Sequence, residues 1–342
     1  MFIGPRDFRW TDILTTSQHD VYHLPGYCAI EARLLKGEEI AWYHEEGGNA
    51  FLIPLVSRVI NCNSNLRDLI SPYGYPGILS ALPASSSTAA HILALFNREA
   101  ASHGYVSSFI RLNPLSNPWQ LPQTESWRQW FHGGTVSVDL ANDLSQITQN
   151  YSENHRRNLR KAADLNLIFN FNQWQYLPTF IEYYRQTMHR HNARPYYFFP
   201  ESYFQCLHDL LGERLLFTGV CDADGYLLAG GLFTQFGGVI QYHLGATGNK
   251  YMHLSPSKLM IHGTIAECKR LNFSTLHLGG GLGGNTNDGL FRFKKGFATN
   301  YHAFTSLRFI HIPSEYCKLK SVVGKNYNRN IYFPEYRVLI EE

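Results

Sequence analysis

The sequence predicts an α/β protein in which mixed sheets are flanked by helices, arranged as two units of similar design. Three observations lead to this fold class. Of the 342 residues, 44% are hydrophobic and 17% are charged, which is enough apolar material for two packed cores. Runs with strand-like composition alternate along the chain with helix-like patterns. The two halves of the chain also repeat a similar rough order of elements.

In the first half the clearest signal is a hairpin. The runs EEIAWYHE and NAFLIPLVSRV flank Gly47-Gly48, which predicts two antiparallel strands joined by a tight turn. A helix is expected over 88–103, with Ser87 or Thr88 as its N-cap. Further strands are expected over 105–112 and 134–140.

From Asp143 onward the pattern predicts a helix pair, a three-stranded meander, a helix and a strand. Ser152 is a plausible N-cap within the first helical stretch. The three strands of the meander are LLFTGVCD, YLLAGGLFTQF and GVIQYHLGA. We therefore expect an N-terminal domain over 1–141, a C-terminal domain over 142–301, and a tail over 302–342 that is counted with the first domain.

Composition limits the function. The net charge is only +3, whereas a general nucleic-acid binder would carry a strongly basic domain, so DNA is not an expected partner. The six cysteines contain no C-x-x-C pair, which argues for reduced thiols rather than a zinc knuckle. The N-terminus lacks the features of a signal peptide and no apolar run reaches 18 residues, so the expected location is the cytoplasm.

The stretch HLGGGLGGNTNDGLFRF contains Gly279, Gly281 and Gly284 at the spacing G-x-G-x-x-G. A dinucleotide site would need a helix directly after the glycines and a second half of the fold beyond it. Here the next residues read as a turn and a strand, and only 58 residues follow Gly284. A dinucleotide site is therefore not expected. Two interpretations stay open: an anion-binding nest of backbone amides, or a surface loop.

The next residues, DGLFRFKKGF, read as a strand. In a strand Phe291 and Phe293 would share one face and Arg292 and Lys294 the other. Two neighbouring cations repel each other unless an anion lies near, so this face fits a phosphate or a tetrahedral oxyanion. The alternative is a solvated strand face.

A basic helix that contains RRNLRKA is expected within DLSQITQNYSENHRRNLRKAADLN, which reads as one or two helices. Arg156, Arg157, Arg160 and Lys161 would fall within an arc of about 140° at 100° per residue. Such a face fits the phosphates of a nucleotide, tRNA or lipid-linked substrate, or else is a solvated amphipathic face. His189 and His191 do not share a helix face, so no metal site is expected.

Three of these stretches resemble the Fem-type transferases and their acetyltransferase-like (GNAT) relatives: RRNLRKA, SPSKLMIHGTIAECKRLNFSTLHLGGG and DGLFRFKKGF. The resemblance implies two fused GNAT-type domains. It also implies transfer of an aminoacyl group from aminoacyl-tRNA, or of an acyl group from a CoA thioester, to an amine. In the Fem family an FK pair lies beside the reacting carbonyl, which carries over onto Phe293 and Lys294. Lys294 is then expected to stabilise the tetrahedral oxyanion.

Two departures from the family leave the donor open. TGNKYMHLSPSK stands where acetyltransferases have their pyrophosphate loop, and no helical hairpin of the kind that some Fem enzymes have for tRNA is inserted. No tightly bound cofactor is expected, and acyl-CoA or aminoacyl-tRNA is expected as co-substrate.

The expected site has a catalytic and a substrate-binding part, in a cleft between the two domains. The catalytic candidates, which include possible proton acceptors, are Lys294, Phe293, Asp288 and His243. The substrate-binding candidates are Tyr73, Tyr75, Arg156, Arg157, Arg160, Tyr242, His277, Gly279, Gly280, Gly281 and Arg292.

The expected function is amide-forming acyl transfer to an amine on a nucleotide- or lipid-linked precursor of the cell envelope, such as peptidoglycan or a polysaccharide. Candidate partners are that precursor, tRNA and the surface of the inner membrane. Two alternatives are an acyl-CoA-dependent acetyltransferase acting on a small amine or amino sugar, and a non-catalytic protein with a degenerate acetyltransferase fold that binds a glycan or nucleotide.

Overall fold

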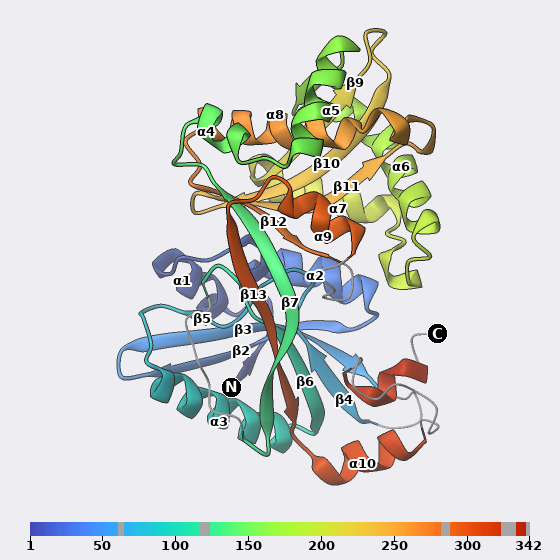
Figure 1. Cartoon of the computed structure of the whole chain (residues 1–342). Coiled ribbons are helices and arrows are strands. Elements are labelled where there is room, and N and C mark those ends of the chain that lie inside the picture. Colours follow the sequence, from blue (N-terminus) through green and yellow to red (C-terminus); the bar gives the residue numbers. More distant parts are fainter. Residues whose placement is uncertain (61–64, 117–123, 282–287, 323–332, 340–342) are drawn as a thin grey trace. The chain divides into compact units, whose positions relative to one another are not determined.

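The computed structural model describes residues 1–60, 65–116, 124–281, 288–322 and 333–339 (Figure 1). The chain forms two compact units: unit 1 comprises Met1–His132 and Phe304–Glu342, and unit 2 comprises Gly133–Ala303. The predicted α/β class is confirmed in both units. The chain passes from one unit to the other within two strands, β7 (Trp127–Asp139) and β13 (Asn300–Ile310).

The sheet of unit 1 has the strand order β1-β2-β3-β4-β6-β13, with β5 paired to β3. The predicted hairpin is confirmed as β2 and β3, which pair from Glu46↔Asn49 to Glu38↔Ser57. Besides β13, the strands of this sheet are β1 (Phe2–Ile3), β2 (Glu38–Glu46), β3 (Asn49–Val59), β4 (Arg67–Ile70), β5 (Leu79–Ser80) and β6 (Tyr105–Arg111).

Helices cover both faces of this sheet (Figure 1). Trp42 packs with the apolar side of α3, whereas its neighbours Ala41 and Tyr43 pack with α1 and α2, as the alternation of a strand requires. The N-cap of α3 is Ser85, two or three residues before the predicted caps, because its hydroxyl accepts from the Thr88 amide. The helices are α1 (Phe8–Thr16), α2 (Pro25–Leu34), α3 (Ser86–Ser102) and α10 (Pro313–Ser321).

The sheet of unit 2 has the strand order β7-β12-β11-β10-β9-β8. The predicted meander is confirmed, since β9, β10 and β11 pair antiparallel in sequence. The strands are β8 (Ile168–Phe171), β9 (Leu215–Cys221), β10 (Leu227–Phe236), β11 (Val239–Thr247) and β12 (Thr275–Gly280).

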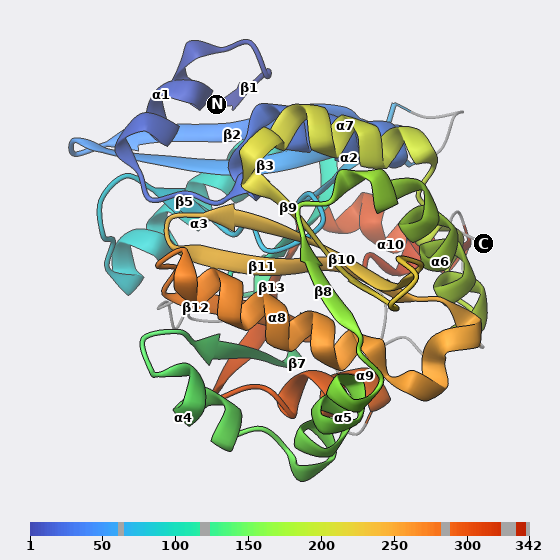
Figure 2. The same ribbon diagram turned by 90° about the horizontal axis from the view of Figure 1, so that it is seen from above.

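Helices also lie on both faces of this second sheet. A Cβ on Gly230 would meet Phe180 of α6, and a Cβ on Gly231 would meet Met260 of α8, so these two helices cover opposite faces. Figure 2 shows α8 lying across the strands. The helices are α4 (Leu144–Gln149), α5 (Glu153–Asp164), α6 (Leu177–Arg190), α7 (Glu201–Leu211), α8 (Pro256–Arg270) and α9 (Gly289–Lys295).

The predicted strand over DGLFRFKKGF is wrong. Residues Gly289–Lys295 form helix α9. Asp288 is its N-cap, because the Asp288 carboxylate accepts from the amides of Leu290 and Phe291 at 2.6 and 3.2 Å. Phe291 and Lys294 are buried one helical turn apart, while Arg292 between them is exposed. The burial period is therefore three, not two, and the pair of cations expected on one face does not exist.

Candidate functional site

The predicted site residues of unit 2 centre on Lys294. Its side chain is buried, with only 9% exposed, and its ammonium donates to the Gly280 carbonyl at 2.8 Å. The same ammonium lies 5.4 Å from the centroid of the Tyr242 ring. The ammonium has three donors, and among the described residues one of them is used, in the bond to Gly280.

Burial lowers the pKa of Lys294 to about 8, and the nearby Asp288 carboxylate partly opposes that shift. Lys294 is therefore mostly protonated at neutral pH and carries its charge in a largely dehydrated place. A cation in such a place interacts strongly with a developing negative charge.

Strands β11 and β12 separate beside this lysine. Their parallel ladder contains the pairs Val239↔Thr275, Ile240↔Leu276 and Gln241↔His277 and then ends, although both strands continue. The pairing of β10 with β11 also shifts between Leu232 and Phe233, opposite His243. Backbone groups beyond Gln241 are thus not used between β11 and β12, and an extended ligand could pair with them.

The predicted glycines occupy the end of β12. Gly279 has φ +75°, which favours glycine, and the register of β12 against β7 shifts between His277 and Gly279. A Cβ on Gly281 would lie 1.7 Å from Asp288 Oδ2, so Asp288 packs directly on that glycine. Gly284 lies outside the described residues. The helix α9 removes one argument against a dinucleotide site, because a helix does follow the glycines.

The predicted histidines are buried and neutral at neutral pH. Burial lowers the pKa of His277 to about 3, with smaller contributions from His302 and Lys294, and the ring bonds to Gln241 Oε1 at 2.5 Å. Burial lowers the pKa of His243 to about 4, and its Nε2 bonds to the Tyr203 hydroxyl of α7 at 2.9 Å. The strands that carry the two histidines, β11 and β12, are neighbours, but the register pairs His277 with Gln241 and not with His243.

Helix α5 packs beside the end of α9. Ser152 caps α5 as predicted, by accepting from the His155 amide. His155 Nε2 donates to the Phe293 carbonyl at 2.8 Å, and the Ser152 amide donates to the Gly296 carbonyl at 2.8 Å. The buried His155, which was not predicted, thus connects the basic helix to the FK pair.

The predicted arginines of α5 are exposed, as is Arg292 of α9.

Next to Arg157 lies a lysine that was not among the predicted site residues. Lys258, in the first turn of α8, is only 8% exposed, and burial and the charge of Arg157 lower its pKa. Within the described part of the chain neither Lys258 nor Arg157 forms an ion pair with a carboxylate. The sequence contained a signal for Lys258, since a lysine in the first turn of a helix opposes the helix dipole.

Two of the predicted tyrosines, Tyr73 and Tyr75, belong to unit 1. Tyr73 follows β4, where its carbonyl accepts from the Tyr27 hydroxyl at 3.0 Å and its amide donates to Glu31 at 3.2 Å. The Tyr75 ring meets that of Phe304 edge to face at 5.2 Å.

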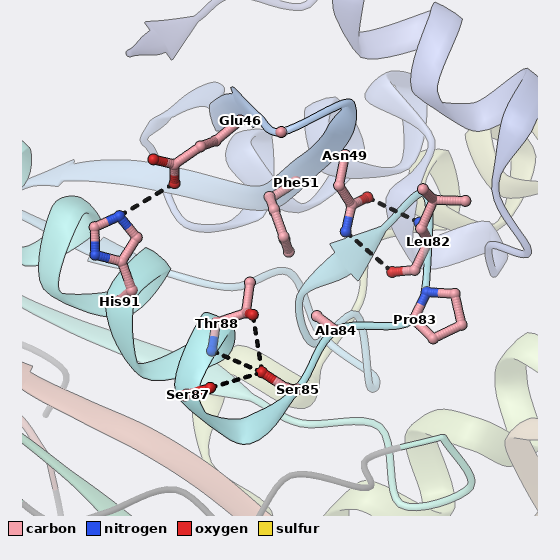
Figure 3. Close-up of a pocket in the computed structure, with 11 residues that line it drawn as sticks. Glu46, Asn49, Phe51, Leu82, Pro83, Ala84, Ser85, Ser87, Thr88 and His91 are labelled. Atoms are coloured by element: carbon pink, nitrogen blue, oxygen red, sulfur yellow. Dashed lines mark hydrogen bonds and ion pairs between the residues drawn. The ribbon is translucent and has the colours of Figure 1, made fainter.

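Unit 1 also has a surface hollow of about 580 Å³ (Figure 3). An ion pair between His91 and Glu46 lies on one side of it, and Asn49 bonds the backbone of Leu82 on the other. Its lining contains none of the predicted site residues.

The family model described as an acetyltransferase (GNAT) domain matches residues 149–295. No curated protein matches the sequence significantly.

Solved structures share the fold across almost the whole chain. FemX aligns with a TM-score of 0.66 at 13% identity, covering 93% of this chain and 99% of its own. L-PGS from Bacillus licheniformis aligns with a TM-score of 0.57 at 13% identity, covering 90% and 94%. A tandem GNAT protein from the clavulanic acid biosynthesis pathway aligns with a TM-score of 0.51 at 12% identity, covering 92% and 99%. Residues 149–295 therefore match the acetyltransferase (GNAT) domain family, and the chain shares its fold with FemX and the other solved structures.

Proposed function

We propose that this protein is an N-acyltransferase that joins an activated acyl or aminoacyl group to an amine on a nucleotide- or lipid-linked precursor of the cell envelope. The observation that carries the proposal is the buried ammonium of Lys294, held at the Gly280 carbonyl where the ladder between β11 and β12 ends. The likeness to FemX and to L-PGS, a lysylphosphatidylglycerol synthetase, supports a peptidoglycan- or lipid-linked acceptor.

In the proposed reaction the amine nitrogen attacks the carbonyl carbon of the donor. The new C–N bond pushes an electron pair onto the carbonyl oxygen, and Lys294 donates a hydrogen bond to this oxyanion. Collapse of the intermediate breaks the bond to the leaving group, an ester oxygen of tRNA or the thiolate of CoA. The amine loses one proton, and the leaving group ends with one.

Asp288 is proposed as the first acceptor of that proton. Its Oδ1 caps α9 by accepting from Leu290 and Phe291, whereas its Oδ2 lies against Gly281 at the end of β12. We propose Oδ2 as the oxygen that takes the proton, because the bonds to Leu290 and Phe291 that cap α9 are made by Oδ1. The lowered pKa values of His243 and His277 make both weaker bases than an ordinary imidazole, so we assign them to binding and positioning.

We propose that Lys258 and Arg157 hold a phosphate of the donor. Lys258 lies in the first turn of the 15-residue helix α8 and Arg157 of α5 is its cationic neighbour, and both a helix N-terminus and a pair of cations favour an anion. Both candidate donors carry phosphates: the diphosphate of acyl-CoA and the 3′ end of aminoacyl-tRNA.

The two donors are separated by measuring binding of acetyl-CoA and of aminoacyl-tRNA to the purified protein. Lys258→Ala should weaken binding of the true donor at least tenfold. Arg270→Ala, at the other end of α8, is the matched control and should leave it unchanged, since Arg270 is exposed and paired with Glu267. Binding of neither donor would leave the non-catalytic alternative as the better account.

A further inference from the structure

A second cationic cluster lies in unit 1, on the face of the strand pair β6 and β13 that carries Ser306. Arg111 of β6 is paired with Ser306, and Arg308 of β13 is paired with Phe109. The two arginines are therefore diagonal neighbours, with Cα atoms about 7–8 Å apart on the same face. Guanidinium groups at this separation can converge on one ligand.

His132 joins the arginines from β7. Its Nε2 lies 2.7 Å from the Ser306 hydroxyl, directly opposite Arg111. The His132 ring meets the Phe109 ring edge to face at 5.9 Å, and Arg111 lies over that same Phe109 ring at 5.2 Å. Burial and the charges of Arg308 and Arg111 lower the pKa of His132 to about 4. The imidazole is neutral at neutral pH and adds no further positive charge.

The arginines are held in place but not neutralised. Arg111 donates to the Ser71 carbonyl at 3.0 Å and lies over the Phe109 ring at 5.2 Å. Arg308 lies over the Trp130 ring at 4.2 Å and over Phe333 at 5.5 Å. Aromatic faces and carbonyl oxygens orient a guanidinium but leave its charge largely uncompensated.

The cluster lacks a counter-charge. Among the described residues no carboxylate forms an ion pair with Arg111 or Arg308, and Arg308 Nε is a buried donor with no acceptor. Burial also lowers the pKa of Arg308, which is the expected response of a cation without a partner. Leaving two such cations half-buried is costly unless an anion binds between them.

We propose that Arg111, Arg308 and His132, with the Ser306 hydroxyl, form a binding site for the phosphate of a phosphorylated sugar or nucleotide. Arginine binds phosphate oxygens through paired N–H donors, and the hydroxyl and neutral imidazole can complete the set. Aromatic rings for the sugar or base lie next to it: Phe304 stacks on His132 at 5.1 Å, and Tyr75 meets Phe304 at 5.2 Å.

Phosphate binding here does not depend on acyl transfer. The proposed function is needed only for the further claim that the bound phosphate belongs to the acceptor substrate of acyl transfer. Measuring binding without any acyl donor therefore separates a failure of this site from a failure of the proposed activity.

The test is calorimetric titration of the full chain at low salt with inorganic pyrophosphate, with uridine diphosphate, and with malonate as a carboxylate probe. Wild type should bind both phosphate probes more tightly than malonate. Arg111→Gln and Arg308→Gln should each weaken pyrophosphate binding at least tenfold. Arg128→Gln should not, since Arg128 is an exposed arginine of the same unit on β7. Absence of binding by wild type, tighter binding of malonate, or an equal loss in Arg128→Gln would overturn the proposal.

A second measurement does not depend on the variants folding. Hydrogen exchange of the wild-type protein, with and without pyrophosphate, should show added protection in β6 and β13. Protection confined to unit 2 would place the phosphate elsewhere and contradict the assignment.

Discussion

At the residue scale, the account depends on the charge of Lys294. Its burial is a cost that packing alone does not explain, because a neutral side chain of similar length would avoid it. Such a charge is kept where its interaction with a ligand or a transition state compensates for the cost. Lys294 was predicted as a site residue because Phe293 and Lys294 resemble the FK pair of the Fem family. The lowered pKa of Lys294 could not be predicted from the sequence, because it depends on the packing of Lys294 against Gly280 and Tyr242 in the fold.

The pH profile of the reaction should report this lysine. As pH rises through about 8, Lys294 loses its proton and with it the hydrogen bond to the oxyanion, so turnover should fall. Lys294→Arg keeps the charge at all these pH values, and its residual activity should show no such fall. A decline near pH 8 that persists unchanged in Lys294→Arg would assign the decline to another group.

Stability should show the opposite dependence on pH. The folded-state pKa of Lys294, about 8, lies below its ordinary value of 10.5, so between these values the unfolded chain binds more protons than the folded one. The free energy of unfolding should therefore gain a rising contribution from about pH 8 to 10.5. Lys294→Met should remove this contribution and raise the melting temperature at neutral pH, as followed by circular dichroism. A lower melting temperature in this variant would show that the ammonium stabilises the fold.

At the scale of secondary-structure elements, the wrong prediction is the strand expected where helix α9 lies. The alternation in FRF favoured a strand, but Phe291, Lys294 and Phe297 are buried at every third position, which is a helical pattern. Asp288 as an N-cap was the other available signal. In contrast, the hairpin of unit 1 and the meander of unit 2 were predicted, because long runs of strand-forming residues separated by glycine turns leave little ambiguity.

Substitution of Asp288 separates its two proposed roles. Asp288→Ala removes both the cap and the carboxylate, and should cost about 0.5–2 kcal/mol of stability through the loss of the cap. Asp288→Asn keeps a capping oxygen but cannot accept the proton. If the carboxylate is the proton acceptor, Asn and Ala should reduce turnover to a similar extent, while only Ala lowers the denaturant midpoint. Near-normal turnover in Asp288→Asn would reduce the role of Asp288 to capping.

At the scale of the whole molecule, the C-terminal segment is part of unit 1. Asp68 of β4 is fully buried and accepts from Arg58 at 3.0 Å, from Arg337 at 2.8 and 2.9 Å, and from the Tyr336 hydroxyl at 3.1 Å. The tail 302–342 was expected with the first domain. Its anchor at Asp68 could not be predicted, because Tyr336 and Arg337 are more than 260 residues from Asp68 in the sequence.

This buried network makes a prediction for unit 1. Asp68→Asn leaves two buried arginines without a full counter-charge, and should destabilise unit 1 by about 3–5 kcal/mol. Chemical denaturation followed by tryptophan fluorescence measures this change. Lys318→Ala is a suitable control, because its ion pair with Glu315 is exposed and should contribute little. A change of less than 1 kcal/mol in Asp68→Asn would show that the tail is not held by this network.

The measurement that tests the central claim most directly is the rate of amide formation by wild type and by Lys294→Ala. It uses a radiolabelled acyl donor, either acetyl-CoA or aminoacyl-tRNA, and an amine-bearing, nucleotide-linked envelope precursor. We predict labelled amide with wild type and a rate at least tenfold lower, and as much as about 10² to 10³ lower, with a folded Lys294→Ala variant. Equal rates in the two proteins would contradict the role of Lys294, and no amide from either donor would contradict the proposed activity.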